Sequence, residues 1–135
     1  MKVIMILKAG LIAGLIICLS AITMVPVVGN EMNMALAKFN LPPISLGAMI
    51  YFFMVSLSVG ITLVWMYAAM LPRFQHRIKT ALIVALIVWF HGNLLANAAN
   101  VVYGFMPVKL TVIGTIWGLG ELLIASLIGC RYYEE

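Results

Sequence analysis

The stretch from Leu110 to Gly129, LTVIGTIWGLGELLIASLIG, is the part of the chain from which the rest can be understood. It is long enough to cross the hydrocarbon core of a bilayer, which takes about 20 mostly apolar residues in a helix. Its one ionisable side chain, Glu121, falls near the middle. An acid at that depth is costly, and it usually faces a bundle interior or a polar partner. The stretch therefore predicts a membrane-spanning helix whose neighbours shield an acid or use it.

The composition of the whole chain indicates the same class of protein. Of its 135 residues, 65% are hydrophobic and 9% are charged, whereas soluble domains have about 25% charged residues. Eight basic residues give a net charge of +4, but they are scattered between apolar runs and form no patch for nucleic acid. The sequence has no recognisable metal-ligand cluster, nucleophile–base set or phosphate-binding glycine loop. We therefore expect a membrane protein without enzymatic activity.

Four apolar windows are each long enough to span a membrane. They cover residues 3–25, 44–71, 80–103 and 110–129. The first is too long for the apolar core of a signal peptide, which has about 7–15 residues. The connections are too short to hold a soluble domain. The sequence predicts an all-α membrane protein whose four transmembrane helices form one up-down bundle over residues 1–135.

Lysine and arginine predict the orientation of this bundle, because they gather in the cytoplasmic loops of membrane proteins. One side holds Lys2, Lys8, Arg73, Arg77, Lys79 and Arg131, and the other holds Lys38 and Lys109. We therefore expect both termini and the second connection to be cytoplasmic. Arg73, Arg77 and Lys79 make that connection a cationic turn, which either anchors the helix ends or binds anionic lipid.

Prolines predict where two of the helices end, since proline lacks the N–H group that continues a helix. Pro26 is expected to end the first helix and Pro72 the second. The segment 31–39 has helix-forming residues and a partly apolar face, so it predicts a short amphipathic helix on the outer surface. The alternative is that this segment forms a lid over an outward-facing cavity.

Three asparagines recur in the second half of the third window. Asn93, Asn97 and Asn100 stand at i, i+4 and i+7 and share one helix face, which Trp89 continues inward. Their amides need partners within a bilayer, so they either bond to neighbouring helices or line a wet cavity. His91 lies about 200° around the helix from Asn93 and is expected to face a different neighbour.

Small residues at helical spacing predict close contact between helices. They stand at Gly10, Gly14 and Cys18 in the first window, and at Gly114, Gly118, Ala125 and Gly129 in the fourth. Glu121 adjoins the second stripe, and Trp117 lies one turn away, where it can cover the acid. Cys18 and Cys130 fall at different depths, so we expect them to be packing residues rather than a disulfide.

Glu121 and His91 are predicted to lie at similar depths, about 16 and 18 Å below the outer ends of their helices. Two interpretations stay open. Glu121 can form a proton- or cation-responsive site with His91 or with the amides of Asn93, Asn97 and Asn100. It can instead lock helix packing through hydrogen bonds. No cofactor is expected; the alternative is a pigment or haem held by His91 alone.

These features favour an accessory or structural subunit that packs against other membrane subunits or against copies of itself. The alternative is a small proton- or cation-responsive transporter or channel that uses Glu121 near the bilayer midplane. A third possibility is a membrane enzyme acting on lipid or quinone, for which one histidine and one acid supply too few groups.

The segment from Val64 to Phe74 reads VWMYAAMLPRF, and Lys79-Thr-Ala81 and Trp89 follow it. The fourth window contains WGLGEL from Trp117 and runs on to Tyr133-Glu134. Together these segments resemble a group of small bacterial four-helix integral membrane proteins of no assigned activity. In that group the turn after Pro-Arg-Phe is usually glycine-rich, whereas here it reads QHRI. The resemblance implies the fold, a bacterial cytoplasmic (inner) membrane location, and Arg73, Lys79 and Glu121 as positions of interest.

Overall fold

The computed structural model describes residues 2–133, and these residues form helices without any strand. The elements are α1 (Val3–Ala37), α2 (Leu46–Phe74), α3 (Arg77–Trp89), a π-helical segment η1 (Phe90–Leu95), α4 (Ala96–Val102) and α5 (Val108–Arg131). Since α3, η1 and α4 continue one another, the described residues contain four helices long and apolar enough to cross a membrane. The predicted all-α, four-helix architecture is confirmed. The side of the membrane on which the termini lie stays a prediction.

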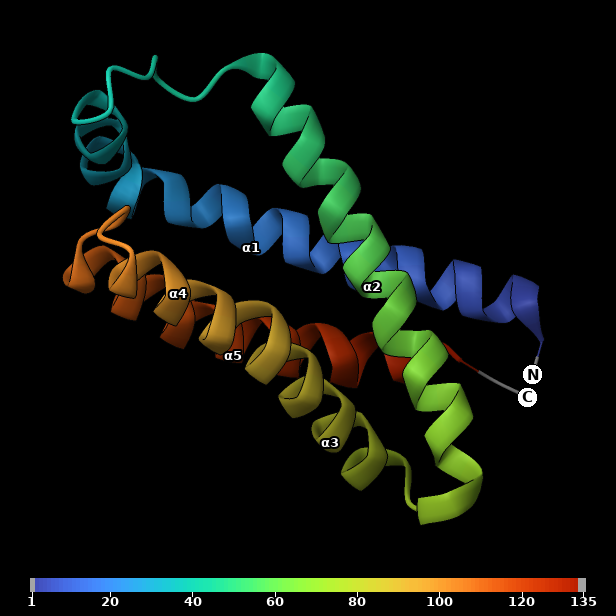
Figure 1. The fold of residues 1–135 in the computed structure, drawn as a ribbon. Coiled ribbons are helices and arrows are strands. Elements are labelled where there is room, and N and C mark those ends of the chain that lie inside the picture. The colour runs from blue at the N-terminus through green and yellow to red at the C-terminus, as the bar shows by residue number, and fades with distance from the viewer. Residues whose placement is uncertain (1, 134–135) are drawn as a thin grey trace.

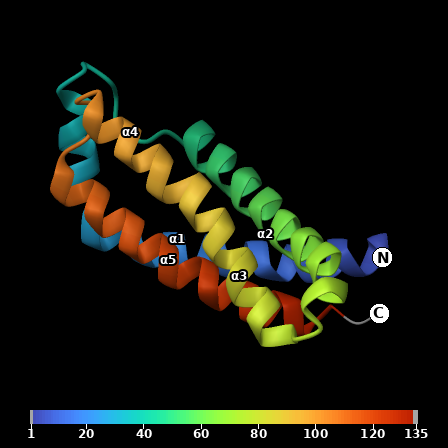
Figure 2. The ribbon, with the colours of Figure 1, turned by 60° about the horizontal axis from the view of Figure 1, so that its bottom comes forward.

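The four helices run up and down between two ends of the bundle. The start of α1, the end of α5 and the turn between α2 and α3 lie at one end, which we call the termini end (Figure 1). The connections 38–45 and 103–107 lie at the other, which we call the loop end. Figure 2 shows α5 running beside α1 on one side and beside α3 on the other, and these neighbours are in contact.

Two helices run past the prolines that were expected to end them. α1 continues through Pro26 to Ala37, so that prediction was wrong. Its last turns, drawn in cyan, turn away from the line of the rest of the helix (Figure 1), as a proline inside a helix causes. Residues 31–37, expected to begin a separate surface helix, belong to these last turns.

The turn between α2 and α3 is also shorter than predicted. α2 continues through Pro72 and ends at Phe74, and the next residue, Gln75, caps it with a left-handed backbone (φ 53°). His76 then caps α3, because its Nδ1 accepts a hydrogen bond of 3.2 Å from the Lys79 amide. The prediction that Pro72 ends the helix was therefore wrong by two residues.

Glycines bring α1 and α2 into backbone contact where they cross. A Cβ at Gly10 would come within 2.5 Å of the Ile61 Cα, and one at Gly14 within 2.7 Å of the Leu57 Cα. A Cβ at Gly60 would meet the backbones of both Gly10 and Gly14. The stripe predicted in the first window is thus a contact between two helix backbones, as small residues allow within membranes.

The core of the bundle lies in the half nearest the termini end. The largest fully buried side chains are Leu63, Val64, Tyr67, Thr80, Val84, Ser126 and Tyr133. In the half nearest the loop end, by contrast, η1 and α4 have no buried residue. Residues 46–59 of α2 have none either. Glu121 lies between these two halves on α5.

Candidate functional site

Glu121 belongs to a short chain of hydrogen bonds between α5 and α1. Trp117 Nε1 donates a hydrogen bond of 2.9 Å to Ser20 Oγ, and the Glu121 side chain is hydrogen-bonded to Ser20 as well. Because the serine oxygen accepts from the indole, its own hydrogen is available for the carboxyl group. Trp117 therefore positions the serine that bonds to the acid. The sequence predicted only that Trp117 would cover Glu121.

These three side chains line a groove of about 740 Å³ between α1 and α5. The other lining residues are Ile16, Leu19, Thr23, Val112, Ile113, Ile116, Gly120 and Ile124. The groove opens on the outside of the bundle, since Leu19, Ile116 and Ile124 are all well exposed, Ile116 by 66%. Glu121 is half-buried. Glu121 thus lies in a groove on the outside of the bundle, and its own chain shields it less completely than predicted.

The asparagine stripe lies against the other side of α5. Asn97 Nδ2 donates a 2.9 Å hydrogen bond to Thr115 Oγ1, and a Cβ at Gly118 would come within 2.8 Å of Asn93 Oδ1. Trp89 Nε1 donates to the Thr115 carbonyl, also at 2.9 Å. Asn97 therefore follows the first of the two predicted alternatives, a hydrogen bond to the neighbouring helix, and neither Asn93 nor Asn97 lines the groove that holds Glu121.

Asn100 closes the turn at the loop end through its backbone. Its carbonyl accepts hydrogen bonds from the Phe105 and Met106 amides at 2.9 and 3.3 Å. Its side chain is half-buried on α4.

His91 lies in the π-helical segment and is exposed. Its Nδ1 is 3.0 Å from the Ile87 carbonyl one turn earlier, and its ring is 5.3 Å from that of Phe90. Among residues 2–133, no hydrogen bond or ion pair joins His91 to Glu121. Within one chain, therefore, the two ionisable groups predicted to share a depth are not a bonded pair.

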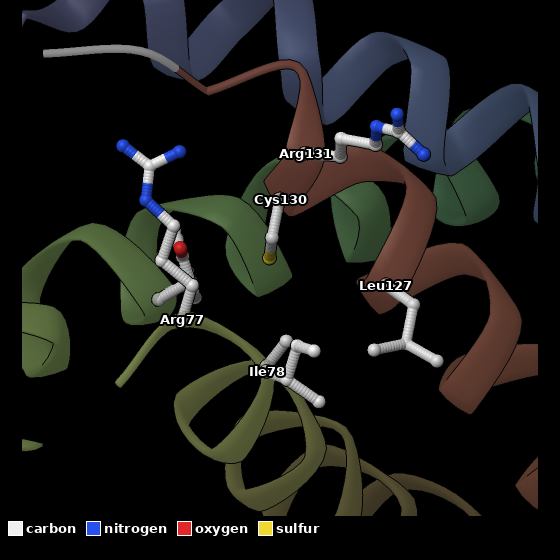
Figure 3. Close-up of a pocket in the computed structure, with 7 residues that line it drawn as sticks. Arg77, Ile78, Leu127, Cys130 and Arg131 are labelled. Atoms are coloured by element: carbon white, nitrogen blue, oxygen red, sulfur yellow. The ribbon is translucent and has the colours of Figure 1, made fainter.

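The cationic turn lies at the termini end with its side chains exposed. Arg73 and Lys79 extend from α2 and α3. Arg77 and Arg131 border a small pocket of about 380 Å³ beside Cys130, and their side chains point in different directions (Figure 3). Contact between these basic residues and anionic lipid stays a prediction.

Groups that could hold a metal ion are absent from residues 2–133, where no three His, Cys, Asp or Glu side chains come together. Cys18 and Cys130 are both free and buried, in accord with the predicted packing role. The alternative of a pigment or haem on His91 stays a prediction.

Sequence reasoning missed Ser20 and Thr115, which receive the bonds from Trp117 and Asn97. Each is a single hydroxyl in an apolar run, and such residues are common in membrane helices. Their positions opposite Glu121 and Asn97 follow from how the helices pair. That pairing is not visible in either segment alone.

Comparison with known proteins assigns no relationship to this site or to the fold. The chain matches no protein-family model, no curated protein and no solved structure.

Proposed function

We propose that this chain is a non-catalytic, multi-pass membrane protein that serves as an accessory or structural subunit of a larger membrane assembly. The observation that carries this proposal is the position of Glu121, half-buried in a groove that opens on the outside of the bundle. Four membrane-length helices support the membrane setting.

An acid that faces lipid is costly. An acidic residue at the centre of a membrane helix costs about 2.5–3.5 kcal/mol on insertion scales. Ser20 offsets part of this cost with one hydrogen bond, but a carboxyl group has two oxygens to satisfy. A polar group from another chain, docked across the groove, would supply the remaining hydrogen bond to the Glu121 carboxyl group. The exposed apolar walls around Leu19, Ile116 and Ile124 would pack against the same partner.

The groove also favours a second candidate, a small proton- or cation-responsive transporter or channel that uses Glu121. Its size falls in the range of ligand sites, about 300–1,000 Å³. Its lining is largely apolar, however, and the amides of Asn93 and Asn97 face α5 instead of a water path. We therefore place the subunit first.

The test is extraction of the tagged chain from its native membrane at native expression, in polymer-bounded lipid discs. Native mass spectrometry then gives the mass and composition of the particle. A subunit should be recovered in particles that contain more than one polypeptide. Recovery of single chains only would overturn the proposal, and proton or cation flux through the purified single chain in liposomes would favour the transporter.

A further inference from the structure

His91 and Glu121 lie at the same level in the bundle, on antiparallel neighbours. Asn93 lies against Gly118 and Asn97 bonds to Thr115. Ser126 Oγ, which donates to the Ala81 carbonyl at 2.8 Å, shows the same antiparallel pairing in the packed half. Two residues before Asn93, His91 is therefore level with about position 120 of α5.

His91 and the groove that Glu121 borders open on opposite outer faces. On α5, Gly118 faces η1, and Gly120, which lines the groove, lies about 200° around the helix from it. On η1, Asn93 faces α5, whereas His91 lies two residues away on the exposed side. The histidine and the groove are thus on opposite sides of α5, each facing the surroundings of the bundle.

The chemistry of the two groups is complementary. A carbonyl can only accept a hydrogen bond, so the contact with Ile87 requires that Nδ1 of His91 carries hydrogen. Nε2 then accepts a hydrogen bond from a neutral acid, or donates one to a carboxylate when the ring is charged. Either arrangement shares one proton between Nε2 and the Glu121 carboxyl. The other pairable acid of the described chain, Glu31, is bonded to Lys109 at the loop end.

From these observations we infer that the partner across the α1–α5 groove is a second copy of this chain, whose His91 meets Glu121. This inference rests on the proposed function and names the partner that it requires. The two surfaces differ, so the contact is head-to-tail. Each copy offers one histidine and one acid, and a head-to-tail contact within a membrane plane repeats until a ring closes.

Two glycines allow a test that leaves both paired side chains in place. Gly92 adjoins His91 and Gly120 adjoins Glu121, and a Cβ at either position has no atom within 4 Å. In a chain with Cys18 and Cys130 replaced by alanine, Gly92→Cys and Gly120→Cys are introduced together and treated in membranes with a short bis-maleimide. We expect a ladder of cross-linked dimers, trimers and higher species.

Single variants supply the controls. Gly92→Cys alone and Gly120→Cys alone should give no dimer, whereas differently tagged chains carrying one each should give a dimer with both tags. Gly92→Cys combined with Gly47→Cys controls for non-specific cross-linking, because Gly47 is an exposed, open position on α2 near the loop end. Glu121→Gln is then added to the chain that carries both Gly92→Cys and Gly120→Cys. It should lower the yield of cross-linked dimer about tenfold, as loss of an interhelical hydrogen bond predicts.

The outcomes separate this inference from the proposed function. Equal cross-linking by the two double variants, or dimers from Gly92→Cys alone, would overturn the head-to-tail pair. Particles that contain a different protein and one copy of this chain would overturn it while leaving the subunit proposal intact. Single chains in native membranes would overturn both.

Discussion

Both halves of this bundle are built largely from apolar residues, but they differ in how they are packed. Near the termini end, Gly60 fits between Gly10 and Gly14, and Tyr67 is 1% exposed. Near the loop end of the same helix, Tyr51 is 66% exposed and α2 does not contact α4. Apolar sequence alone therefore places a residue in the membrane without deciding whether protein or lipid surrounds it.

Polar side chains follow the same division. Every fully buried side-chain nitrogen or oxygen in residues 2–133 has a hydrogen-bond partner, and Ser126 in the packed half bonds across to α3. Glu121, at the boundary of the halves, is only half-buried. The packed half is complete within one chain, whereas we propose that a group from outside the chain completes the groove near Glu121.

The largest effect is expected where backbones touch. Gly60→Leu should prevent recovery of folded protein, because the side chain would meet the backbone of α1, and a backbone cannot give way as a flexible side chain does. Gly47→Leu, on the same helix, should fold normally, since only the Ser45 hydroxyl lies near it, at 3.8 Å from a Cβ. The yield of folded, monodisperse protein in detergent compares the two variants, and thermal unfolding followed by circular dichroism measures the stability of whatever is recovered. Equal stability of the two variants would contradict the packing difference.

The two tyrosines of α2 give the next largest contrast. Tyr67→Ala should lower the free energy of unfolding by about 3–5 kcal/mol, the range for emptying a buried aromatic site. Tyr51→Ala, at an exposed position, should change it by no more than about 0.5 kcal/mol. Reversible unfolding in mixed micelles gives both values. A cost for Tyr51→Ala close to that for Tyr67→Ala would show that the loop-end half is packed within the single chain.

Two serines that donate to backbone carbonyls allow a finer comparison. Ser126→Ala removes a bond between helices, to the Ala81 carbonyl, and should cost about 1 kcal/mol. Ser58 is exposed and bonds to the Met54 carbonyl of its own helix, so Ser58→Ala should be close to neutral. The same unfolding measurement applies. A larger loss of stability for Ser58→Ala than for Ser126→Ala would contradict the expectation that the bond between helices contributes more.

The smallest effect is expected at the ion pair of the loop end. Lys109 Nζ lies 3.2 Å from Glu31 Oε1, with both side chains substantially exposed. Exposed pairs of this kind contribute about 0.2–1 kcal/mol and are screened by salt. Glu31→Gln should therefore lower stability by less than about 1 kcal/mol, and the difference should shrink when unfolding is repeated at high salt. A salt-independent loss would mean that the contact between the loop-end parts of α1 and α5 is not an ordinary exposed ion pair.

Two features could be predicted from the sequence: the four helices and the glycine contact of α1. The depth of Glu121 in the membrane stays a prediction. Hydrophobic length and small-residue spacing are properties of single helices, so they can be found without the fold. Which helix Glu121 faces could not be predicted in this way, because lipid-facing and partner-facing positions are equally apolar.

Local backbone changes account for the other differences. Pro26 and Pro72 were expected to stop helices, yet membrane helices tolerate proline because their surroundings satisfy the freed groups. The π-helical turn at Phe90–Leu95 has no sequence signature that we could apply. The hydroxyl of Ser20, which bonds to Glu121, became recognisable only when α1 and α5 were placed together.

The central claim is that another chain covers Glu121 in the membrane, and chemical modification of the unaltered protein tests it most directly. A hydrophobic carbodiimide reacts with protonated carboxyl groups that lipid can reach. In native membranes, peptide mass spectrometry should find Glu121 unmodified, and dispersal into single chains in detergent should make it reactive, with Glu121→Gln confirming the site. Ready modification of Glu121 in the native membrane would contradict the account, because it would show the acid open to lipid.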